Sequence, residues 1–467
     1  MKEESKSVID DAVSRLWIAP IGDTHFEVAV KIAERCLGVA EPDLKYHFHD
    51  PRKFSGGEYC PRFALTNGGP RTLKGKSVYI ILIPGPYKSS EDRVERACIT
   101  AYAAKENGAD KVVLLATDFP HARQDRGPAE DENALGEATT VRWRARQFQA
   151  AGIDQVITTH EHTSRIAAFF AIEYGLIPKD KLPQGIAEQL RYIKVPEHIN
   201  ASNPEIQQIG RQVFKSISPH AFLADYILYQ SSIVGSEYLK DGGAKLALKA
   251  MDKGNRPFID QLYASLFLPN CVRVYFDKKR KKKNDMKELE TSVERTSDNF
   301  VSLDGMFEIF ADDGLETGGS LIKSVEMSMQ GNVCPKSGKS YGTPADRLAY
   351  WTHSWLGGDA FLMVQETLFK RVLAREIVTT ETRPYINDGQ YHRFKGKSTV
   401  LRFASLWADA IIANELGVDI MQRYTGFQTE PEQHDFISKL YKLKRHSRHF
   451  LVEDSEPEKR KLKFYLR

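Results

Sequence analysis

Residues 307–320 read FEIFADDGLETGGS, and this stretch decides how we interpret the fold. Its first part is apolar and strand-forming. Two acids, Asp312 and Asp313, come next, and a Thr-Gly-Gly-Ser turn then leads into a helical pattern. Glycines let backbone N–H groups approach an anion, and the start of a helix adds partial positive charge. This order predicts a phosphate-binding site at the carboxyl end of a strand in an α/β sheet.

The side chains of the same stretch suit a phosphorylated sugar. The hydroxyl groups of Thr317 and Ser320 can donate hydrogen bonds to a phosphate. The acid pair can bind sugar hydroxyls or a magnesium ion. The alternative interpretation is a surface turn with incidental acids.

Strand-like and helix-like segments alternate on both sides of this stretch. Short runs rich in β-branched residues lie at 78–82, 112–115, 156–159, 272–276, 307–310 and 377–380. Helical spacing of apolar residues occurs at 24–36 and 91–107. Such alternation predicts mostly parallel sheets flanked by helices. Because the pattern runs twice, we expect an α/β fold with two lobes, at residues 1–190 and 191–420, followed by a basic C-terminal extension at 421–467.

Composition excludes several classes of protein. The chain has 467 residues, 41% of them hydrophobic, and a formal net charge of +4, which argues against intrinsic disorder. No apolar run approaches the roughly 18 residues of a membrane span, and the acidic first residues do not look like a signal peptide. The five cysteines are far apart and form no CxxC pair. We therefore expect a cytoplasmic protein of a reducing compartment, with no membrane partner.

A basic run comes directly after the strand-like segment at 272–276. Residues 277–283 read DKKRKKK, and six adjacent cations repel one another unless an anion neutralises them. The run could be a nuclear signal, a nucleic-acid patch or a solvated loop. Its position directly after a strand favours a mobile loop that closes over a polyphosphate.

Two further segments come after strand-like runs of the first lobe. Residues 122–126 read ARQDR, which could clamp a nucleotide or form a structural ion-pair cluster. Residues 158–162 read TTHEH. Side chains two apart on a strand face the same way, so His160 and His162 could both point at a metal ion.

Taken in order, these segments resemble the ribose-phosphate diphosphokinase family, also called the phosphoribosyl diphosphate (PRPP) synthetase family. Residues 54–58, FSGGE, look like the family's FSDGE loop, and residues 122–126 match its ARQDR segment. The similarity is strongest at 312–320, which is similar to the family's DDxxDTGGT, and softer at 352–353 and 379–384. It covers about residues 20–420 and identifies the chain as an elongated, divergent member.

The resemblance implies a fold, an activity and partners. Members have two phosphoribosyltransferase-like lobes and transfer the β,γ-diphosphoryl group of ATP to the C1 hydroxyl of ribose 5-phosphate, which releases AMP. Such a transfer needs charge neutralisation more than covalent chemistry. The resemblance therefore implies Mg²⁺ as cofactor, ATP and a phosphorylated ribose as partners, self-association into a dimer or larger oligomer, and no nucleic-acid partner.

The resemblance also implies roles for individual residues. Transition-state charge would be stabilised by Lys278 and Arg280. ATP would be bound by Arg123, Gln124 and Asp125, and by Phe54 and Glu58 of a neighbouring subunit. The ribose phosphate would be bound by Asp312, Asp313, Glu316, Thr317, Gly318, Gly319 and Ser320. Magnesium would be bound by His162, and Asp241, which precedes a Gly-Gly pair, is the nearest candidate for a second metal ligand.

Several differences from the family pattern leave the acceptor open. Gly56 and His160 each replace an Asp, Glu316 replaces the Asp of DTGGT, and the chain is longer than typical members. The same chemistry on a larger ribosyl acceptor such as ADP-ribose, as in phage NAD-rebuilding enzymes, is therefore a second hypothesis. A non-catalytic regulatory homologue is the third. The basic run and the acid pair favour an enzyme.

Overall fold

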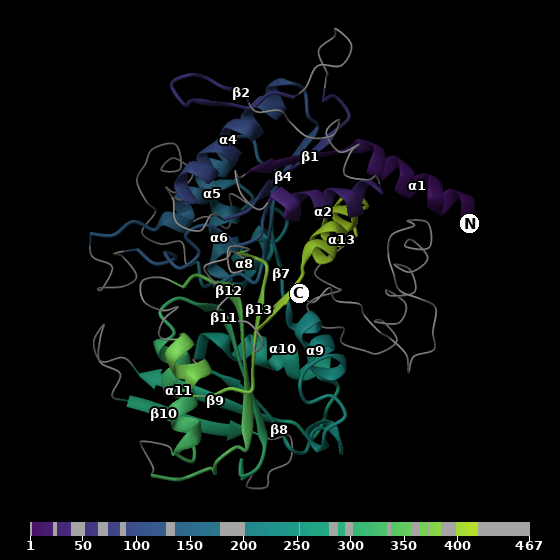
Figure 1. Cartoon of the computed structure of the whole chain (residues 1–467). Coiled ribbons are helices and arrows are strands. Elements are labelled where there is room, and N and C mark those ends of the chain that lie inside the picture. Colours follow the sequence, from purple (N-terminus) through teal and green to yellow (C-terminus); the bar gives the residue numbers. More distant parts are fainter. Residues whose placement is uncertain are drawn as a thin grey trace. The chain divides into compact units, whose positions relative to one another are not determined.

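The structure is a computed structural model, and it describes most of the chain between residues 2 and 418. The described residues are 2–21, 26–38, 52–63, 73–84, 90–127, 136–177, 201–251, 253–279, 288–294, 302–333, 338–356, 364–371, 373–383 and 398–418. They form two compact units: unit 1 comprises Met1–Ile217 with Ala404–Met421, and unit 2 comprises Ser218–Phe403. Each unit is built around its own sheet (Figure 1).

Unit 1 contains a five-stranded sheet in which every neighbouring pair is parallel. Its strands, in sheet order, are β1 (Leu16–Ile21), β4 (Ser77–Leu82), β5 (Lys111–Ala116), β6 (Gln155–Thr159) and β7 (Phe214–Ile217). A short hairpin, β2 (Arg52–Lys53) and β3 (Tyr59–Cys60), lies outside this sheet. Helices α4 (Ser90–Glu106), α5 (Thr140–Ala150), α6 (Arg165–Glu173) and α8 (Pro204–Gly210) lie on one side of the sheet, and α1 (Lys2–Arg15), α2 (Phe26–Leu37) and α13 (Ala404–Glu415) lie on the other (Figure 1).

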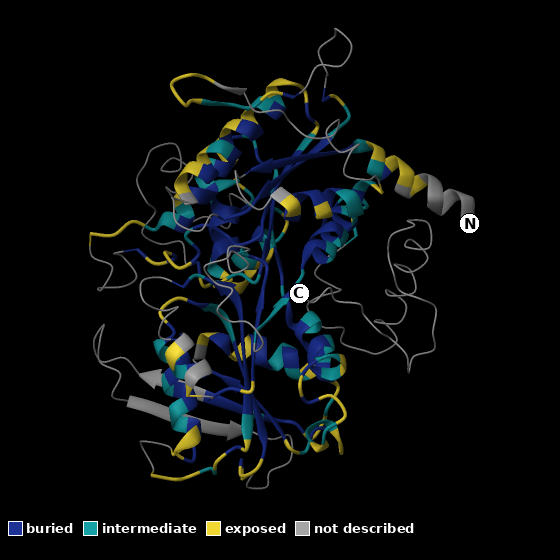
Figure 2. Ribbon diagram, viewed as in Figure 1, coloured by how far each residue is buried: buried dark blue, intermediate teal, exposed yellow. Residues whose placement is uncertain are grey.

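Burial on both faces explains why the strands of unit 1 read as continuous apolar runs. All six residues of β1 and all six of β4 are buried, which is typical of parallel strands covered by helices on both sides (Figure 2). Aromatic side chains fill the space next to β7, where the ring of Phe119 lies 5.3 Å from that of Phe214 and 6.0 Å from that of Phe170. The expected helices at 24–36 and 91–107 are confirmed as α2 and α4.

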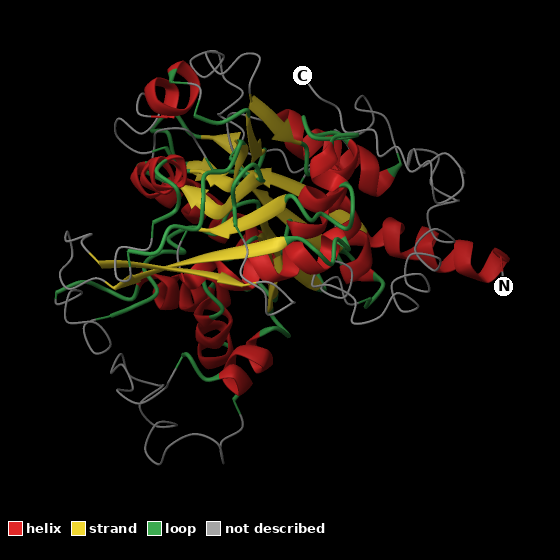
Figure 3. Cartoon of the chain, turned by 90° about the horizontal axis from the view of Figure 1, so that it is seen from below, coloured by secondary structure: helices red, strands yellow, loops and turns green. Residues whose placement is uncertain are grey.

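Unit 2 contains a seven-stranded sheet. Its strands, in sheet order, are β10 (Glu288–Glu294), β9 (Val272–Lys279), β8 (Leu246–Ala250), β11 (Phe307–Leu315), β12 (Asp346–Ser354), β13 (Glu376–Thr380) and β14 (Ser398–Leu401). Among these described strands, all neighbours are parallel except β10, which runs antiparallel to β9. Helices α9 (His220–Tyr229) and α10 (Arg256–Leu266) cover one face, and α11 (Gly319–Met329) covers the other (Figure 1). Figure 3 shows strands in yellow with helices in red on both sides of them. The predicted α/β architecture with two mostly parallel sheets is confirmed.

Two elements differ from the sequence-based expectation. Strand β9 continues through Lys279, so the basic run starts within a strand, because β10 provides an antiparallel partner that places Lys278 opposite Leu289. The units also differ in extent from the predicted lobes, since β7 pairs with β6 and α13 packs against α2 in unit 1.

No helix within the described ranges is long and apolar enough to cross a membrane.

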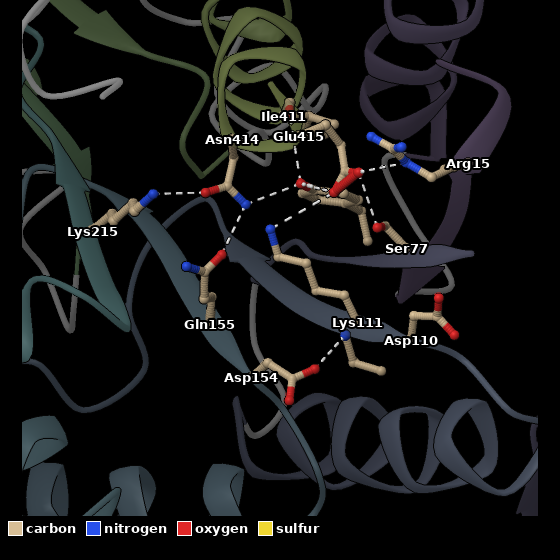
Figure 4. Close-up of polar contacts among 12 residues, drawn as sticks. Arg15, Ser77, Asp110, Lys111, Asp154, Gln155, Lys215, Ile411, Asn414 and Glu415 are labelled. Carbon is tan, nitrogen blue, oxygen red and sulfur yellow. Dashed lines mark hydrogen bonds and ion pairs between the residues drawn. The ribbon is translucent and has the colours of Figure 1, made fainter. Parts of the chain in front are cut away.

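Helix α13 is attached to unit 1 by buried polar contacts at the amino ends of the strands (Figure 4). The Glu415 side chain is only 4% exposed, and it accepts hydrogen bonds from Ser77 Oγ at 3.0 Å and from the Tyr79 hydroxyl at 3.2 Å. The same carboxylate lies 3.7 Å from Lys111 Nζ and 3.8 Å from Arg15 Nε. Burial lowers the pKa of Lys111, and the Glu415 carboxylate opposes that shift by favouring the charged ammonium.

The preceding residue, Asn414, extends the same network to two more strands. Its side-chain Nδ2 donates to the Tyr79 hydroxyl and to Gln155 Oε1, each at 3.0 Å, and its side-chain Oδ1 accepts from Lys215 Nζ at 2.7 Å. Two adjacent residues of α13 therefore satisfy polar groups at the starts of β4, β5 and β6 and on β7. This explains why a helix that comes after the last strand of unit 2 belongs to unit 1.

We expect Glu415→Gln to lower the free energy of unfolding of unit 1 by about 2 kcal/mol, because it removes the carboxylate that lies 3.7 Å from the partly buried Lys111 ammonium. The measurement is urea denaturation followed by circular dichroism. Glu106→Gln, at an exposed position near the end of α4, is the matched control and should change stability by less than about 0.5 kcal/mol. Equal effects of the two substitutions would contradict the role given to Glu415.

Candidate functional site

The predicted phosphate-binding segment forms the carboxyl end of β11 and the start of α11. Asp312 and Asp313 are half-buried near the end of the strand, Glu316 and Thr317 are exposed in the turn, and α11 begins at Gly319. Gly318 is the N-cap residue and has no side chain to accept hydrogen bonds from the first helical turn. Backbone N–H groups at this helix start can therefore donate to an anion, and the helix dipole favours negative charge there.

Gly318 is required by the local backbone. Its φ angle is +75°, in the left-handed region that side chains disfavour, and an added Cβ would lie 3.2 Å from Val364 Cγ2. At Gly319 the nearest atom to an added Cβ would be Thr317 Oγ1, at an ordinary 3.8 Å. The first glycine of the pair therefore shapes the turn, whereas the second has room for a side chain.

The backbone at the acid pair is held by a local hydrogen bond and by a residue in the connection after β8. Asp312 Oδ1 accepts a hydrogen bond from the Asp313 backbone N–H at 2.9 Å. Asn255, which is buried at the start of α10, donates from its side-chain amide to the carbonyl oxygen of Ala311. The connection after β8 is thereby joined to the residue that precedes the acid pair. The sequence analysis missed Asn255. Its position shortly after β8, a strand parallel to β11, could have indicated that it lies at the same edge of the sheet as the acid pair.

The structure does not bring Asp241 to this edge of the sheet. Asp241 is exposed, has a φ angle of +50° and precedes the amino end of β8, whereas the acid pair lies at the carboxyl end of the parallel strand β11. An acid placed after β8 would suit the edge better. Asp252, two residues beyond β8 in the sequence, is such an acid, although it lies outside the described residues.

Basic and hydroxyl-bearing residues occur at the ends of other strands of unit 2. Strand β9 is parallel to β8 and continues four residues beyond the last pair with it, Ala250 with Tyr275, so its backbone carries Lys278 past the carboxyl edge. Arg280 and the side chain of Lys278 lie outside the part that the structure describes. Two of the segments with softer similarity to the family meet near the ends of β12 and β13. There, a ring nitrogen of His353 and Thr382 Oγ1 are hydrogen bonded at 3.0 Å.

In unit 1 the ARQDR segment comes after β5 and contains both exposed and buried side chains. Arg123, Gln124 and Arg126 are exposed, whereas Asp125 is 8% exposed. Asp125 Oδ2 lies 3.1 Å from Arg165 Nε, and the same guanidinium donates to the Asp125 carbonyl oxygen at 3.3 Å. Asp125 therefore anchors the segment and leaves the flanking arginines and Gln124 accessible.

Arg165 is the first residue of α6 and lies shortly after the TTHEH segment, so it joins the two predicted sites of unit 1. His162 is exposed, and Glu161 is ion-paired with Arg211. The expected parallel orientation of His160 and His162 does not arise from a strand, because β6 ends at Thr159 and His160 has a left-handed φ angle of +43°.

Phe54 and Glu58 form the exposed turn between β2 and β3. The Phe54 backbone N–H donates to the Glu58 carbonyl oxygen at 3.2 Å, and the Phe54 ring is 43% exposed. The turn therefore presents an aromatic ring and a carboxylate at the surface of unit 1.

Within the described part of the chain, no three His, Cys, Asp or Glu side chains form a cluster that could hold a metal ion.

Comparison with known proteins gives similarity over most of the chain. No protein-family model matches it. The chain is 24% identical over 362 residues to ribose-phosphate pyrophosphokinase 1 of Candida albicans, which covers 77% of this chain and 84% of the relative. It is 33% identical over 172 residues to ribose-phosphate pyrophosphokinase 4 of Saccharomyces cerevisiae, which covers 37% of this chain and 47% of the relative.

Among solved structures, phosphoribosylpyrophosphate synthetase from Mycobacterium smegmatis has a similar fold. The TM-score is 0.56, with 19% identical residues over 86% of this chain and 98% of the other. This likeness concerns the fold, and it agrees with the two mostly parallel sheets of this chain.

We expect Gly318→Ala to weaken binding of ribose 5-phosphate at least tenfold, because the added methyl group disturbs the turn against Val364. The measurement is isothermal titration calorimetry. Gly305→Ala is the matched control: Gly305 also has a left-handed φ angle, +70°, but an added Cβ there meets nothing within 4 Å. Both substitutions should cost about 1 kcal/mol of stability, and only Gly318→Ala should affect binding. Similar binding by the two variants would show that the turn does not hold the phosphate.

Proposed function

This chain is a divergent relative of the ribose-phosphate pyrophosphokinases, and from that premise we propose that it transfers the β,γ-diphosphoryl group of ATP to the C1 hydroxyl of ribose 5-phosphate. The observation that carries the proposal is the carboxyl edge of the unit 2 sheet. A half-buried acid pair, an uncapped helix start and the basic end of β9 all belong to that edge. The edge can bind a phosphate, sugar hydroxyls and a polyphosphate.

Each part of the edge has a role in this proposal. The backbone N–H groups at Gly319 and Ser320, with the Thr317 and Ser320 hydroxyls, bind the 5-phosphate of the acceptor. Asp312 and Asp313 bind the ribose hydroxyls, either directly or through a metal ion. The acceptor's C1 hydroxyl is thereby held in a fixed position, which reduces the entropic cost of the reaction.

ATP is bound by the accessible side chains of unit 1 in this proposal. Arg123 and Gln124 contact the nucleotide, and Asp125 supports them through its ion pair with Arg165. Phe54 and Glu58 of a neighbouring subunit contact the adenine, because an exposed aromatic ring can stack on a base. The active protein is accordingly a dimer or a larger oligomer.

The donor atoms of the acid pair fit Mg²⁺. This ion prefers oxygen ligands and is commonly held by one or two carboxylates together with substrate phosphates, so a preformed cluster of protein ligands is not required. In unit 2 the candidate ligands are Asp312 and Asp313, with Asp252 as a further one, and in unit 1 the exposed His162 is a separate candidate. When bound, the ion neutralises phosphate charge.

In the transfer, the C1 hydroxyl oxygen attacks the β-phosphorus of ATP. A new bond forms between that oxygen and the β-phosphorus, the bond between the β-phosphorus and the oxygen bridging to the α-phosphate breaks, and AMP leaves with the bridging oxygen. The proton of the attacking hydroxyl passes to solvent. Lys278 and Arg280 stabilise the negative charge that develops on the transferred group, which is the main catalytic requirement of phosphoryl transfer.

The nucleotide product tests the proposed chemistry. We expect AMP, not ADP, when the purified protein is incubated with ATP, Mg²⁺ and ribose 5-phosphate, and we expect EDTA to abolish the reaction. Chromatography of the nucleotides gives the answer. Steady formation of ADP would identify an ordinary kinase. AMP release with ADP-ribose but not with ribose 5-phosphate would retain the diphosphoryl transfer and overturn the proposed acceptor.

Lys278→Ala should lower kcat by about a hundredfold or more, equivalent to roughly 3 kcal/mol of transition-state stabilisation, with a smaller change in the KM for ATP. A cation that meets charge mainly in the transition state acts on the barrier and little on substrate binding. Lys282→Ala, in the same basic run, is the control and should have a mild effect. Similar losses in both variants would mean that the run acts only as a diffuse positive patch.

A further inference from the structure

Trp355 lies directly over the backbone just beyond the acid pair. It comes immediately after β12, is half-buried, and an added Cβ at Gly314 would lie 2.4 Å from its Cζ3 atom. A separation that short means that the indole ring occupies the space where a side chain at position 314 would be. Gly314 is the residue next to Asp313, so the ring lies over the backbone of β11 immediately after the acid pair.

Gly314 is needed for this close approach and not for its backbone conformation. Its φ angle lies outside the left-handed region, unlike that of Gly318. An alanine at 314 would therefore be tolerated by the backbone if the indole ring were absent. Gly314 and Trp355 therefore form a matched pair: the indole ring fills the space beside residue 314, and that space is open because residue 314 has no side chain.

The backbone after Trp355 is held in an unfavourable conformation. Leu356 has a φ angle of +43°, which for a bulky residue costs about 1 kcal/mol or more and is retained only when the surroundings impose it. Its N–H donates to the Leu315 carbonyl oxygen at 2.9 Å, and the two leucine side chains belong to the same buried cluster. These contacts fix Trp355 against the end of β11.

The indole ring is also supported by His353, the partner of Gly314 in the register of β11 and β12. The two rings are stacked, with centroids 5.6 Å apart and planes at 23°. His353 is 2% exposed and hydrogen bonded to Thr382 Oγ1, which itself donates to the Thr352 carbonyl oxygen at 3.0 Å. The orientation of Trp355 is therefore determined by buried groups on β12 and just after β13.

We propose that Trp355 is a positioning residue, which covers Gly314 and so holds Asp312 and Asp313 in the orientation that binds the acceptor. The bulk of Trp355 and the absence of a side chain at 314 act together. The proposal rests on the proposed function for the identity of the ligand that the acid pair binds, whereas the effect of Trp355 on the order of the 312–320 segment does not depend on it.

The first test uses the free protein and needs no substrate. Hydrogen–deuterium exchange of peptides covering residues 312–320 should be at least tenfold faster in Trp355→Ala than in the parent protein. Trp355→Phe, which keeps a ring over Gly314, should retain most of the protection. Trp143→Ala, at a position that is 55% exposed on α5 of unit 1, is the control and should leave the segment unchanged. Unchanged exchange in Trp355→Ala would overturn the proposal.

The second test uses the matched pair. Gly314→Ala should displace the indole ring and raise the KM for the ribosyl acceptor at least tenfold, with less than a twofold change in the KM for ATP. Gly314→Ala combined with Trp355→Ala should raise the acceptor KM no more than Trp355→Ala alone, because the methyl group has room once the indole ring is absent. A Gly314→Ala variant with unchanged acceptor KM and unchanged exchange would contradict the proposal.

The two tests separate the two claims. If the parent protein turned over no ribosyl acceptor, the proposed function would fail, and the exchange measurement alone would decide the role of Trp355. If the parent protein were active and Trp355→Ala left both the exchange rate and the acceptor KM unchanged, only the positioning role would fail.

Discussion

Parallel pairing of the strands is the constraint on which the candidate site depends. Neighbouring parallel strands end at the same edge of a sheet, so the segments that leave β8, β9, β11, β12 and β13 all emerge on one side of unit 2. Residues that are far apart in the sequence thereby meet: Asp312 lies near the end of β11, Asn255 comes after β8, and His353 lies near the end of β12. Reversing a single strand would send its residues to the opposite edge, as the position of Asp241 before β8 illustrates.

Buried charged groups at the amino ends of the strands are paired with one another, whereas the carboxyl edges present exposed and half-buried polar side chains. At the amino edge of unit 1, Glu415 and Asn414 bind the starts of the strands, and near the start of β11 in unit 2 Glu308 Oε1 lies 3.1 Å from Lys249 Nζ, with both side chains 0% exposed. Burial lowers the pKa of Lys249, and the Glu308 carboxylate offsets that shift. The helix start at Gly319 and the exposed Arg123 instead leave hydrogen-bond donors accessible at the carboxyl edges, which is where a binding function is expected.

The sequence was sufficient for features that depend on local pattern and insufficient for those that depend on distant contacts. Apolar runs and the order of strand, acids and glycines predicted the sheets and the β11–α11 turn, since both arise from neighbouring residues. The assignment of α13 to unit 1 depends on Glu415 meeting residues more than 300 positions away, which no local pattern reveals. The contact of Trp355 with Gly314 was equally invisible, because a glycine selected for close approach looks the same in a sequence as one selected for a turn. The alternation expected at His160 and His162 does not apply, because β6 ends at Thr159 and His160 has a left-handed φ angle.

The central claim is that the carboxyl edge of the unit 2 sheet binds the phosphorylated ribose. A crystal structure of the protein with ribose 5-phosphate and Mg²⁺ tests this most directly. We expect the phosphate oxygens to lie within hydrogen-bonding distance of the backbone N–H groups at residues 318–320. We expect the ribose hydroxyls to face Asp312 and Asp313, directly or through the metal ion. A sugar phosphate bound elsewhere on the protein, with the 312–320 segment making no contact to it, would contradict the account.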